Sequence, residues 1–482
     1  MATCCSPASR SPAGIADRNT LPVAIIGGGP VGLAAAVHLI ERGLEPVILE
    51  AGARVAAAVQ DWGHVRMFSP WRHNMDRACR TLLESHGWAA PDAESFPTGR
   101  DLAERYLEPL AELPELASRI RLGTRVTAVT RAGLGKVRDA GRGSTPFEIR
   151  FEDARGREGR LLAGAVIDAS GTWGNHGRAG ASGLSATGER AAADRIRYRI
   201  PDVLGADRER YAGRRTVVLG SGDSALGILI NLSRLAEQAP GTTIVWAARS
   251  KDLTRALGGG AADQLPERGA LGTRVRDLAA RGVLDIVKPF AVDEIARAPD
   301  GALLVTGMGE AGMLTIAADE MIVATGFRPD LTMLGEVRLD LDPALDCPRA
   351  LAPLIDPNLH SCGTVRPHGA AELEQPEPGL FIVGMKSYGR APTFLLATGY
   401  EQVRSVAAFL AGDIEASRRV ELDLPQTGIC SSNLVADDIA CCGGPAPAQA
   451  AACCMQDVQA KAAGAGGCGC PGTALETVEA AA

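Results

Sequence analysis

The feature that most constrains the fold of this chain is a glycine-rich turn between an apolar strand and a helix near the N-terminus. Residues 21–26 form an apolar run with β-branched side chains, and the sequence Gly-Gly-Gly-Pro-Val-Gly follows at residues 27–32. An Ala- and Leu-rich stretch then predicts a helix that ends near Gly43, and residues 46–50 predict a second strand. A strand, helix, strand unit with glycines at this spacing is typical of a dinucleotide-binding fold.

Each residue of this first fingerprint has its own physical role. Gly27 permits the tight turn, and Gly29, followed by Pro30, lets the backbone approach a pyrophosphate at the positive helix N-terminus. Gly32 allows close packing of the helix on the strand. Glu50 follows the glycines by about 20 residues, where its carboxylate can accept hydrogen bonds from ribose hydroxyls. A glycine-rich turn without a ligand is the alternative, which this complete context disfavours.

A second copy of the pattern begins near residue 214. An apolar strand at residues 214–219 leads into Gly-Ser-Gly-Asp-Ser-Ala at residues 220–225, then into a helix and a strand at residues 242–247. The final small position is Ala, which the fingerprint allows. The residues expected at this second nucleotide site are Gly220, Gly222, Asp223 and Ser224.

The residues after the second strand differ between the two copies. Arg249 and Lys251 stand where the first copy has an acid. Basic side chains at this place can pair with a 2′-phosphate, which a carboxylate would repel. The second fingerprint therefore favours NADPH over NADH, with a solvated basic loop as the alternative.

Three further segments have the form of a strand followed by a turn of small residues, at residues 166–172, 321–329 and 379–385. With these turns and the two fingerprints, the chain resembles the two-dinucleotide-binding-domain flavoproteins over roughly residues 20–412. That superfamily includes the thioredoxin reductases and the flavin-containing monooxygenases. The resemblance implies an α/β fold with two Rossmann-like domains, FAD at the first fingerprint and NADPH at the second. It also implies cofactor contacts at the three turns, at Gly171, Thr325, Gly326, Gly384 and Met385, although many members have Asp in place of Met385.

The resemblance also implies a division of the chain into domains. We expect an N-terminal extension at residues 1–20, an FAD-binding domain at 21–175 and 312–412, and an NADPH-binding domain at 176–311. A flexible Cys-rich tail at residues 413–482 would follow. No aromatic residue occurs after Phe409, and seven of the 12 cysteines lie in the last 53 residues.

Within the superfamily, four segments narrow the resemblance. Residues 61–71, 97–100, 169–174 and 388–394 look like those of flavoprotein monooxygenases found beside arsenic-resistance genes. This resemblance implies an FAD-dependent, NADPH-using monooxygenase with a role in arsenic or metalloid resistance. It places four side chains in the flavin region as candidates for contact with the isoalloxazine ring or the substrate, and simple packing is the alternative for each: Trp62, His64, Arg66 and Arg72.

The positions of the cysteines separate this chain from disulfide reductases. No cysteine occurs between Cys5 and Cys79 or between Cys79 and Cys347, so neither dinucleotide domain carries a redox pair at the positions those enzymes use. Flavin-containing monooxygenases usually carry a further fingerprint with a histidine just before the second nucleotide site. In this chain Glu209 stands where that histidine would fall. Two alternatives stay open: an NADPH-dependent flavin reductase that passes electrons to a thiol, disulfide or metalloid through the C-terminal cysteines, and a non-catalytic flavin or metalloid sensor.

The tail contains adjacent cysteine pairs, which argue against a zinc ribbon because structural zinc prefers cysteines two to four residues apart. Thiolates in a flexible segment suit soft, thiophilic centres, and trivalent arsenic is one of these. Chance cysteines and an easily reduced disulfide are the alternatives. The expected metalloid thiols are Cys441, Cys442, Cys453 and Cys454.

Charge and hydropathy limit which partners and which cellular compartment are expected for this chain. A net charge of -7 gives no basic field for nucleic acid, and no apolar run approaches the roughly 18 residues of a membrane span. The first 20 residues lack the apolar stretch of a secretory signal, so we expect a cytoplasmic protein. Its expected partners are oxygen and a small-molecule substrate, with arsenicals among the candidates, and a homodimer is left open.

Overall fold

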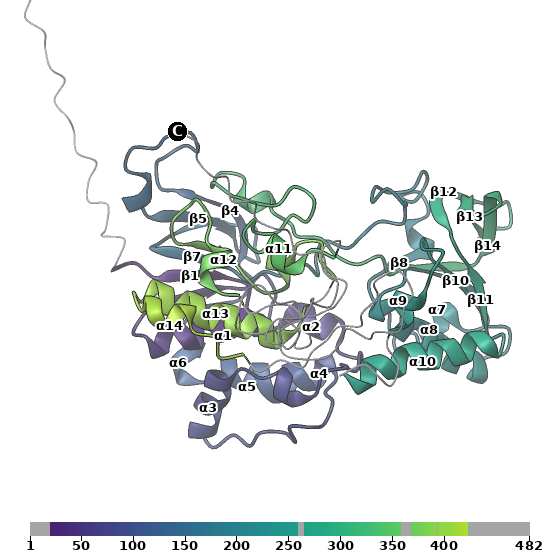
Figure 1. Cartoon of the computed structure of the whole chain (residues 1–482), viewed down its shortest axis with the longest axis horizontal. Coiled ribbons are helices and arrows are strands. Elements are labelled where there is room, and N and C mark those ends of the chain that lie inside the picture. Colours follow the sequence, from purple (N-terminus) through teal and green to yellow (C-terminus); the bar gives the residue numbers. More distant parts are fainter. Residues whose placement is uncertain (1–19, 259–264, 358–367, 393, 423–482) are drawn as a thin grey trace, which may run out of the picture.

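The computed structural model describes residues 20–258, 265–357, 368–392 and 394–422, which form two lobes lying side by side (Figure 1). Each lobe contains a five-stranded parallel sheet and a separate three-stranded sheet with antiparallel pairing. The predicted α/β fold with two Rossmann-like units is therefore confirmed.

The parallel sheet of the first lobe has the strand order β16-β7-β1-β2-β3. Helix α1 connects β1 to β2, as the fingerprint predicts, and the apolar strands β1 and β7 are buried along their whole length. The elements of this lobe's sheets are β1 (Val23–Ile26), α1 (Pro30–Glu41), β2 (Pro46–Leu49), β3 (Ile120–Arg121), β4 (Arg125–Arg131), β5 (Phe147–Glu152), β6 (Glu158–Ala163), β7 (Ala165–Asp168) and β16 (Leu380–Ile382).

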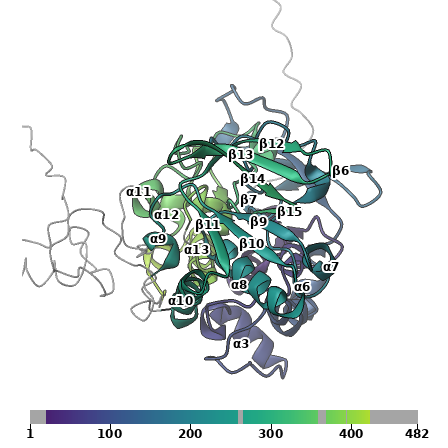
Figure 2. The ribbon, with the colours of Figure 1, turned by 90° about the vertical axis from the view of Figure 1, so that its right-hand side faces the viewer.

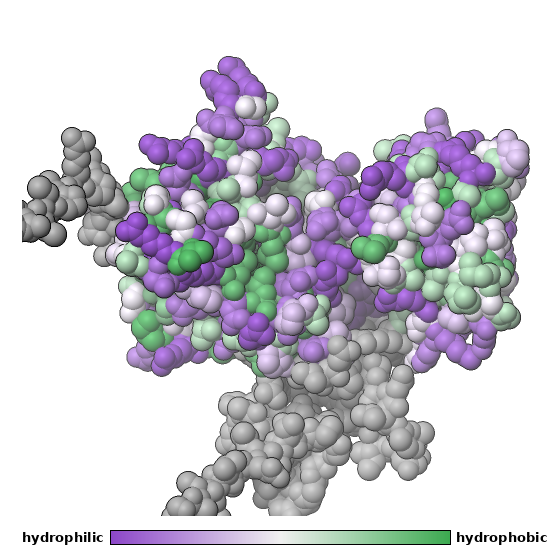
Figure 3. Space-filling model, turned by 90° about the horizontal axis from the view of Figure 1, so that it is seen from above, coloured by the Kyte–Doolittle hydropathy of each residue, from purple (hydrophilic) through white to green (hydrophobic). Residues whose placement is uncertain are grey.

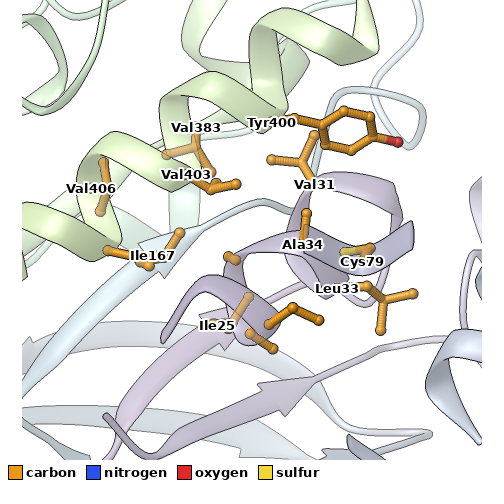
Figure 4. Close-up of a cluster of buried hydrophobic side chains, with 14 of the residues drawn as sticks. Ile25, Val31, Leu33, Ala34, Cys79, Ile167, Val383, Tyr400, Val403 and Val406 are labelled. Atoms are coloured by element: carbon orange, nitrogen blue, oxygen red, sulfur yellow. The ribbon is translucent and has the colours of Figure 1, made fainter. Parts of the chain in front are cut away.

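The core of the first lobe joins the two ends of the described chain. Helix α13 (Leu396–Leu410) packs against α1, and side chains from both helices and from β1 and β7 converge there (Figure 4). Ile25 and Val403 are fully buried in this cluster. Gly399 makes the close approach of the helices feasible, because a Cβ at this position would lie 2.7 Å from Val31 Cγ2.

The parallel sheet of the second lobe has the strand order β11-β10-β9-β15-β8, and Figure 2 views this lobe from its outer side. Helix α8 connects β9 to β10, so the second fingerprint also forms the predicted strand, helix, strand unit. The elements of this lobe are β8 (Ile196–Tyr198), β9 (Arg215–Leu219), α8 (Asp223–Gln238), β10 (Thr243–Ala247), α10 (Pro266–Ala280), β11 (Leu284–Val287), β12 (Ala291–Arg297), β13 (Leu303–Gly309), β14 (Gly312–Ala318) and β15 (Glu320–Val323).

Both lobes also contain shorter helices. Among the described residues, none of the helices is long and apolar enough to cross a bilayer. These shorter helices are α2 (Ala57–Asp61), α3 (Arg77–Ser85), α4 (Gly99–Leu102), α5 (Glu108–Ala111), α6 (Pro114–Ala117), α7 (Arg208–Tyr211), α9 (Thr254–Leu257), α11 (Ala352–Ile355), α12 (Ala370–Leu373) and α14 (Ile414–Arg418).

Two expected domain boundaries differ from the structure. Strands β14 and β15 belong to the second lobe, so that lobe ends after Val323 instead of at residue 311. β15 lies between β8 and β9, which makes it part of the second parallel sheet. At the C-terminal end, α14 packs on α13, and Arg404 Nη1 donates to Ala416 O at 2.9 Å. The folded part of the chain therefore continues past residue 412, while most of the predicted tail, with its cysteines, lies outside the described residues.

Candidate cofactor sites and the junction between the lobes

The first glycine turn has a closed side and an open side. Gly27 has a φ of +102°, and a Cβ there would lie 2.8 Å from Ala169 O. A Cβ at Gly32 would lie only 2.0 Å from Gly27 O, whereas a Cβ at Gly29 would meet no atom within 4 Å. Helix α1 starts directly afterwards at Pro30, so its N-terminal dipole points at the open side. The open side at Gly29 has room for a pyrophosphate, and its binding there stays a prediction.

Glu50 lies beside the same turn, at the end of β2. Its Oε2 accepts a hydrogen bond from the Gly28 amide at 2.6 Å, and its Oε1 accepts one from the Gly52 amide at 2.6 Å. A carboxylate oxygen has more than one lone pair, so each oxygen can accept a further bond from a ribose hydroxyl. The position of Glu50 and its two acceptor oxygens are compatible with the predicted role.

The second glycine turn repeats this asymmetry. Gly220 has a φ of +136°, and a Cβ there would lie 2.2 Å from Ala324 O, while a Cβ at Gly222 would meet no atom within 4 Å. Trp246 Nε1 donates a 2.8 Å hydrogen bond to Gly220 O and fixes the turn from below. Asp223 and Ser224 begin α8. The turn is therefore built like the first one.

The two basic residues expected to select NADPH lie exposed after β10. Arg249 Nη1 donates a 3.0 Å hydrogen bond to Ala181 O, and Lys251 forms an ion pair with Glu310. Exposed pairs of this kind contribute little to stability, so a 2′-phosphate can compete for either side chain. Their selection of NADPH stays a prediction.

The remaining expected cofactor turns also have left-handed glycines. Gly171 has a φ of +68° and Gly326 a φ of +87°, and a Cβ at either would meet open space. Thr325 Oγ1 donates a 3.0 Å hydrogen bond to Arg178 O. Gly384 has a φ of +67°, and the half-buried Met385 follows it.

Three of the turns in the first lobe meet at one edge of its sheet. Asp168, the last residue of β7, is the register partner of Ile26 on β1 and of Ile382 on β16. The strands are parallel, so their carboxyl ends lie together, and ligands of open α/β sheets bind outside such ends. The glycine turn after Ile26 therefore has the turns after β7 and β16 as its neighbours.

A cluster of side chains joins the two lobes. Trp173 lies on the first segment that crosses between them, and its indole ring stacks on Phe327 of the second crossing segment, with centroids 5.0 Å apart. Trp173 Nε1 donates a 2.9 Å hydrogen bond to Asp61 of the first lobe. The guanidinium of Arg199, just after β8, lies 5.0 Å from the Trp173 ring and 3.8 Å from the same carboxylate. Arg199 has a φ of +69°, a strained value for a residue other than glycine. We call these four residues the junction cluster. On the face shown in Figure 3, hydrophilic residues predominate on the surface where the two lobes meet.

The four candidates for flavin or substrate contact make different contacts in the structure. Trp62 packs on Gly99, where a Cβ would lie 2.5 Å from its ring. Arg66 lies over the Phe96 ring, and Arg72 forms an exposed ion pair with Glu94. These contacts agree with packing or surface roles, although they do not test the prediction.

His64 differs from the other three candidates. It is half-buried, and its Nε2 is shielded from solvent without a hydrogen-bond partner among the described residues. A ring nitrogen in this state can bind a ligand at no cost in existing hydrogen bonds. His64 is therefore the candidate whose local chemistry best suits contact with a ligand.

The described residues include two cysteines, and neither is suited to redox chemistry. Cys79 and Cys347 are buried and unpaired. Burial raises the pKa of the Cys347 thiol to about 12 and raises that of Cys79 well above its ordinary value. Burial therefore disfavours the thiolate, the reactive form, at both positions.

Sequence reasoning missed several residues that the structure brings to these sites. Asp61, Trp173 and Arg199 lie in the junction cluster, and Lys386 with Asp168 forms a buried ion pair near the turns of the first lobe. The strained backbone of Arg199 has no signal in the sequence. A lysine directly after a glycine turn is visible in the sequence, but its burial and its partner are not.

Comparisons with known proteins agree with this geometry. Residues 24–138 match the pyridine nucleotide-disulphide oxidoreductase family. The indole-3-pyruvate monooxygenase YUCCA1 of Oryza sativa subsp. japonica is 27% identical over 228 residues, which are 44% of this chain and 44% of that protein. The match thus spans less than half of that relative.

Solved structures share the fold over most of both chains. The bacillithiol disulfide reductase Bdr of Bacillus cereus superimposes with a TM-score of 0.60 at 19% identity, covering 81% of this chain and 99% of that chain. DfoA, the cadaverine monooxygenase of desferrioxamine biosynthesis in Erwinia amylovora, superimposes with a TM-score of 0.59 at 15% identity, covering 84% and 98%. The chain therefore has the fold of the two-dinucleotide-binding-domain flavoproteins, as predicted. The family match agrees with the predicted oxidoreductase class, and the arsenic-resistance link stays a prediction.

Proposed function

We propose that this chain is an FAD-dependent oxidoreductase that takes electrons from NADPH and delivers them to oxygen, as a monooxygenase does. One observation carries the choice of oxygen. The described residues form two glycine turns with an open side at a helix N-terminus, yet their two cysteines are buried and unpaired, and burial raises the pKa of both thiols. Within the described residues there is accordingly no dithiol to receive electrons, and this favours oxygen as the acceptor.

The residues of the first lobe suit FAD and those of the second suit NADPH. FAD, when bound, supplies the chemistry: it can accept a hydride and pass the electrons on to oxygen. The open side of Gly29 with the α1 N-terminus would bind its pyrophosphate, and Glu50 would bind a ribose. Gly222 and the α8 N-terminus would do the same for NADPH.

The junction cluster would set the distance between the two cofactors. Asp61 belongs to the first lobe and Arg199 to the second, while Trp173 and Phe327 come from the two crossing segments. Hydride transfer requires the reacting atoms of the two rings to lie close together in the correct orientation. A fixed junction therefore favours productive transfer.

The named relatives support this class without naming a substrate for this chain. YUCCA1 and DfoA are both named monooxygenases, and Bdr is named a disulfide reductase. We propose trivalent arsenicals as the first substrates to test. This choice rests on the sequence resemblance and on the vicinal cysteines of the tail, Cys441-Cys442 and Cys453-Cys454.

The test measures consumption of NADPH and of oxygen by the purified full-length protein against arsenicals, amines, organic sulfides and disulfides. A monooxygenase consumes both in equal amounts and forms an oxygenated product when its substrate is present. Oxidation of NADPH that continues without oxygen when a disulfide is added would identify a reductase and would contradict the proposal. Failure of the protein to bind flavin at all would contradict it too.

A further inference from the structure

A buried ion pair lies directly beneath the turns of the first lobe. Lys386 Nζ is 2.6 Å from Asp168 Oδ2, and both side chains are at most 1% exposed. Asp168 ends β7, and Lys386 lies in the 3-10 turn Gly384–Tyr388 that follows β16. The pair thus connects two turns that border the first glycine turn. Burial of an ammonium group is costly unless it is paired and hydrogen-bonded.

Both members of the ion pair are hydrogen-bonded to one hydroxyl group, that of Ser170. Ser170 Oγ lies 2.6 Å from Asp168 Oδ1 and 3.0 Å from Lys386 Nζ. The ammonium group can only donate, so the hydroxyl accepts from Lys386 and gives its own proton to Asp168. Ser170 is itself exposed. One lone pair of its oxygen is left to accept a hydrogen bond.

This hydroxyl is next to the first glycine turn. A Cβ placed on Gly27 would lie 2.9 Å from the Ser170 Cα, so the two backbones are in contact. The Asp168 side chain also accepts a 3.1 Å hydrogen bond from the Ser170 amide, which fixes the backbone of this turn. The serine is therefore oriented from two directions before any ligand arrives.

We propose that Ser170 contacts FAD by accepting a hydrogen bond from one of its hydroxyl groups, and that Lys386 and Asp168 are positioning residues which orient Ser170. The proposal rests on the proposed binding of FAD in the first lobe. It requires a hydrogen-bond donor on the cofactor because the remaining capacity of the serine oxygen is to accept, and the hydroxyl groups of FAD are its most numerous donors. A phosphate oxygen also only accepts, so it would not satisfy this group.

A second buried ionic cluster in the same lobe shows what a purely structural arrangement looks like. Glu377 is 0% exposed, and its carboxylate pairs with Arg131 and Arg142, which are themselves buried. No side chain of that cluster's three residues is left exposed at a turn. The Lys386 cluster differs because it ends at an exposed hydroxyl beside the glycine turn.

The experiment titrates flavin-free protein with FAD and follows the quenching of flavin fluorescence. We expect Ser170→Ala to weaken FAD binding by roughly five- to tenfold, the effect of one lost hydrogen bond, in a protein whose circular dichroism shows that it still folds. The matched control is Ser144→Ala, which removes an exposed hydroxyl bonded to Gly141 O and should leave FAD binding unchanged.

The role of Lys386 is tested by coupling. Lys386→Met should also weaken FAD binding, whereas Lys136→Met, which removes an exposed lysine bonded to Gly335 O, should not. If Lys386 acts through Ser170, its substitution should cost less affinity in the Ser170→Ala background than in the wild type. A loss of stability alone would leave the two effects additive in FAD affinity.

The outcomes separate this proposal from the proposed function. Unchanged affinity of Ser170→Ala in a protein that binds FAD normally would overturn the proposal and leave the function intact. Additive effects of the two substitutions would overturn the positioning role of Lys386. A wild-type protein that binds no FAD would overturn the proposed function itself.

Discussion

The indole nitrogen of Trp173 donates a hydrogen bond of 2.9 Å to the carboxylate of Asp61. Asp61 is the last residue of α2 in the first lobe, and Trp173 lies on a segment that leads into the second lobe. Arg199 faces both of them from the second lobe, at 3.8 Å from the same carboxylate oxygen. This small group therefore links the first lobe to the second through a hydrogen bond and an ion pair.

Loss of the Trp173 hydrogen bond should slow the transfer of electrons between the two nucleotide sites. We expect Trp173→Phe to lower the rate at which NADPH reduces the bound flavin by about tenfold, because small errors in the placement of reacting groups are costly. FAD affinity should stay the same. Anaerobic stopped-flow absorbance gives the rate. Trp88→Phe is the matched control, since its indole donates to Arg105 O within the first lobe; equal rates for both variants would contradict this role.

The open side of Gly29 leads to a prediction that separates folding from binding. A Cβ at this position meets no protein atom within 4 Å, so Gly29→Val should fold. The side chain would fill the space expected for the pyrophosphate, and the purified protein should therefore lack flavin. Flavin absorbance and circular dichroism measure the two properties. Gly135→Val, at an exposed position with equal space, is the control, and a yellow Gly29→Val protein would show that the pyrophosphate lies elsewhere.

The pair of His38 and Asp76 predicts how stability depends on pH. Burial alone would lower the pKa of His38, but Asp76 at 3.0 Å and Glu41 outweigh burial and raise the pKa to about 9. The stabilisation is therefore fully present below the unfolded value of 6.5 and disappears as pH rises through about 9. The change is on the order of 3 kcal/mol in the free energy of unfolding.

Chemical denaturation of the wild type and of His38→Gln between pH 6 and about 9.5 checks this sign. The difference in unfolding free energy between the two proteins should shrink as pH rises, because only the wild type loses a charged partner of Asp76. The pKa of Asp76 is lowered in the folded state, chiefly by His38 in opposition to its burial, which agrees with an ionised pair. A constant difference across this range would mean that His38 is neutral.

The C-terminal end of the fold gives a prediction about truncation. Arg404 Nη1 donates to Ala416 O, and Ser405 Oγ donates to Ser417 O, so α14 is part of the first lobe. A chain that ends after Leu422 should keep its melting temperature and its reduction by NADPH. A chain that ends after Gly412 should lose roughly 1–3 kcal/mol of unfolding free energy. Equal melting temperatures would show that α14 adds nothing.

The two fingerprints could be predicted because their glycines are required by the local backbone conformation. Gly27 and Gly220 need left-handed or very close backbone, and such demands leave a fixed spacing in the sequence. The Lys386 cluster could not be predicted in this way, since Lys386 and Ser170 are 216 residues apart. Contacts at that separation arise from the order of the strands.

The boundary of the second lobe shows the same limit. β15 follows an antiparallel hairpin, and its strand character could be predicted from the sequence, whereas its partner strands could not. Its pairing with β8 and β9 assigns it to the second sheet. Likewise, the polar helix α14 looks like the start of a tail until its contacts with α13 are known.

The most direct test of the whole account is anaerobic mixing of the purified full-length protein with NADPH and, separately, with NADH. We expect NADPH to bleach the visible absorbance of FAD bound in the first lobe, and NADH to do so more slowly at equal concentration. Oxygen should then restore the absorbance. A protein that carries FAD but is not reduced by NADPH would contradict the central claim that the two nucleotide sites act as one oxidoreductase.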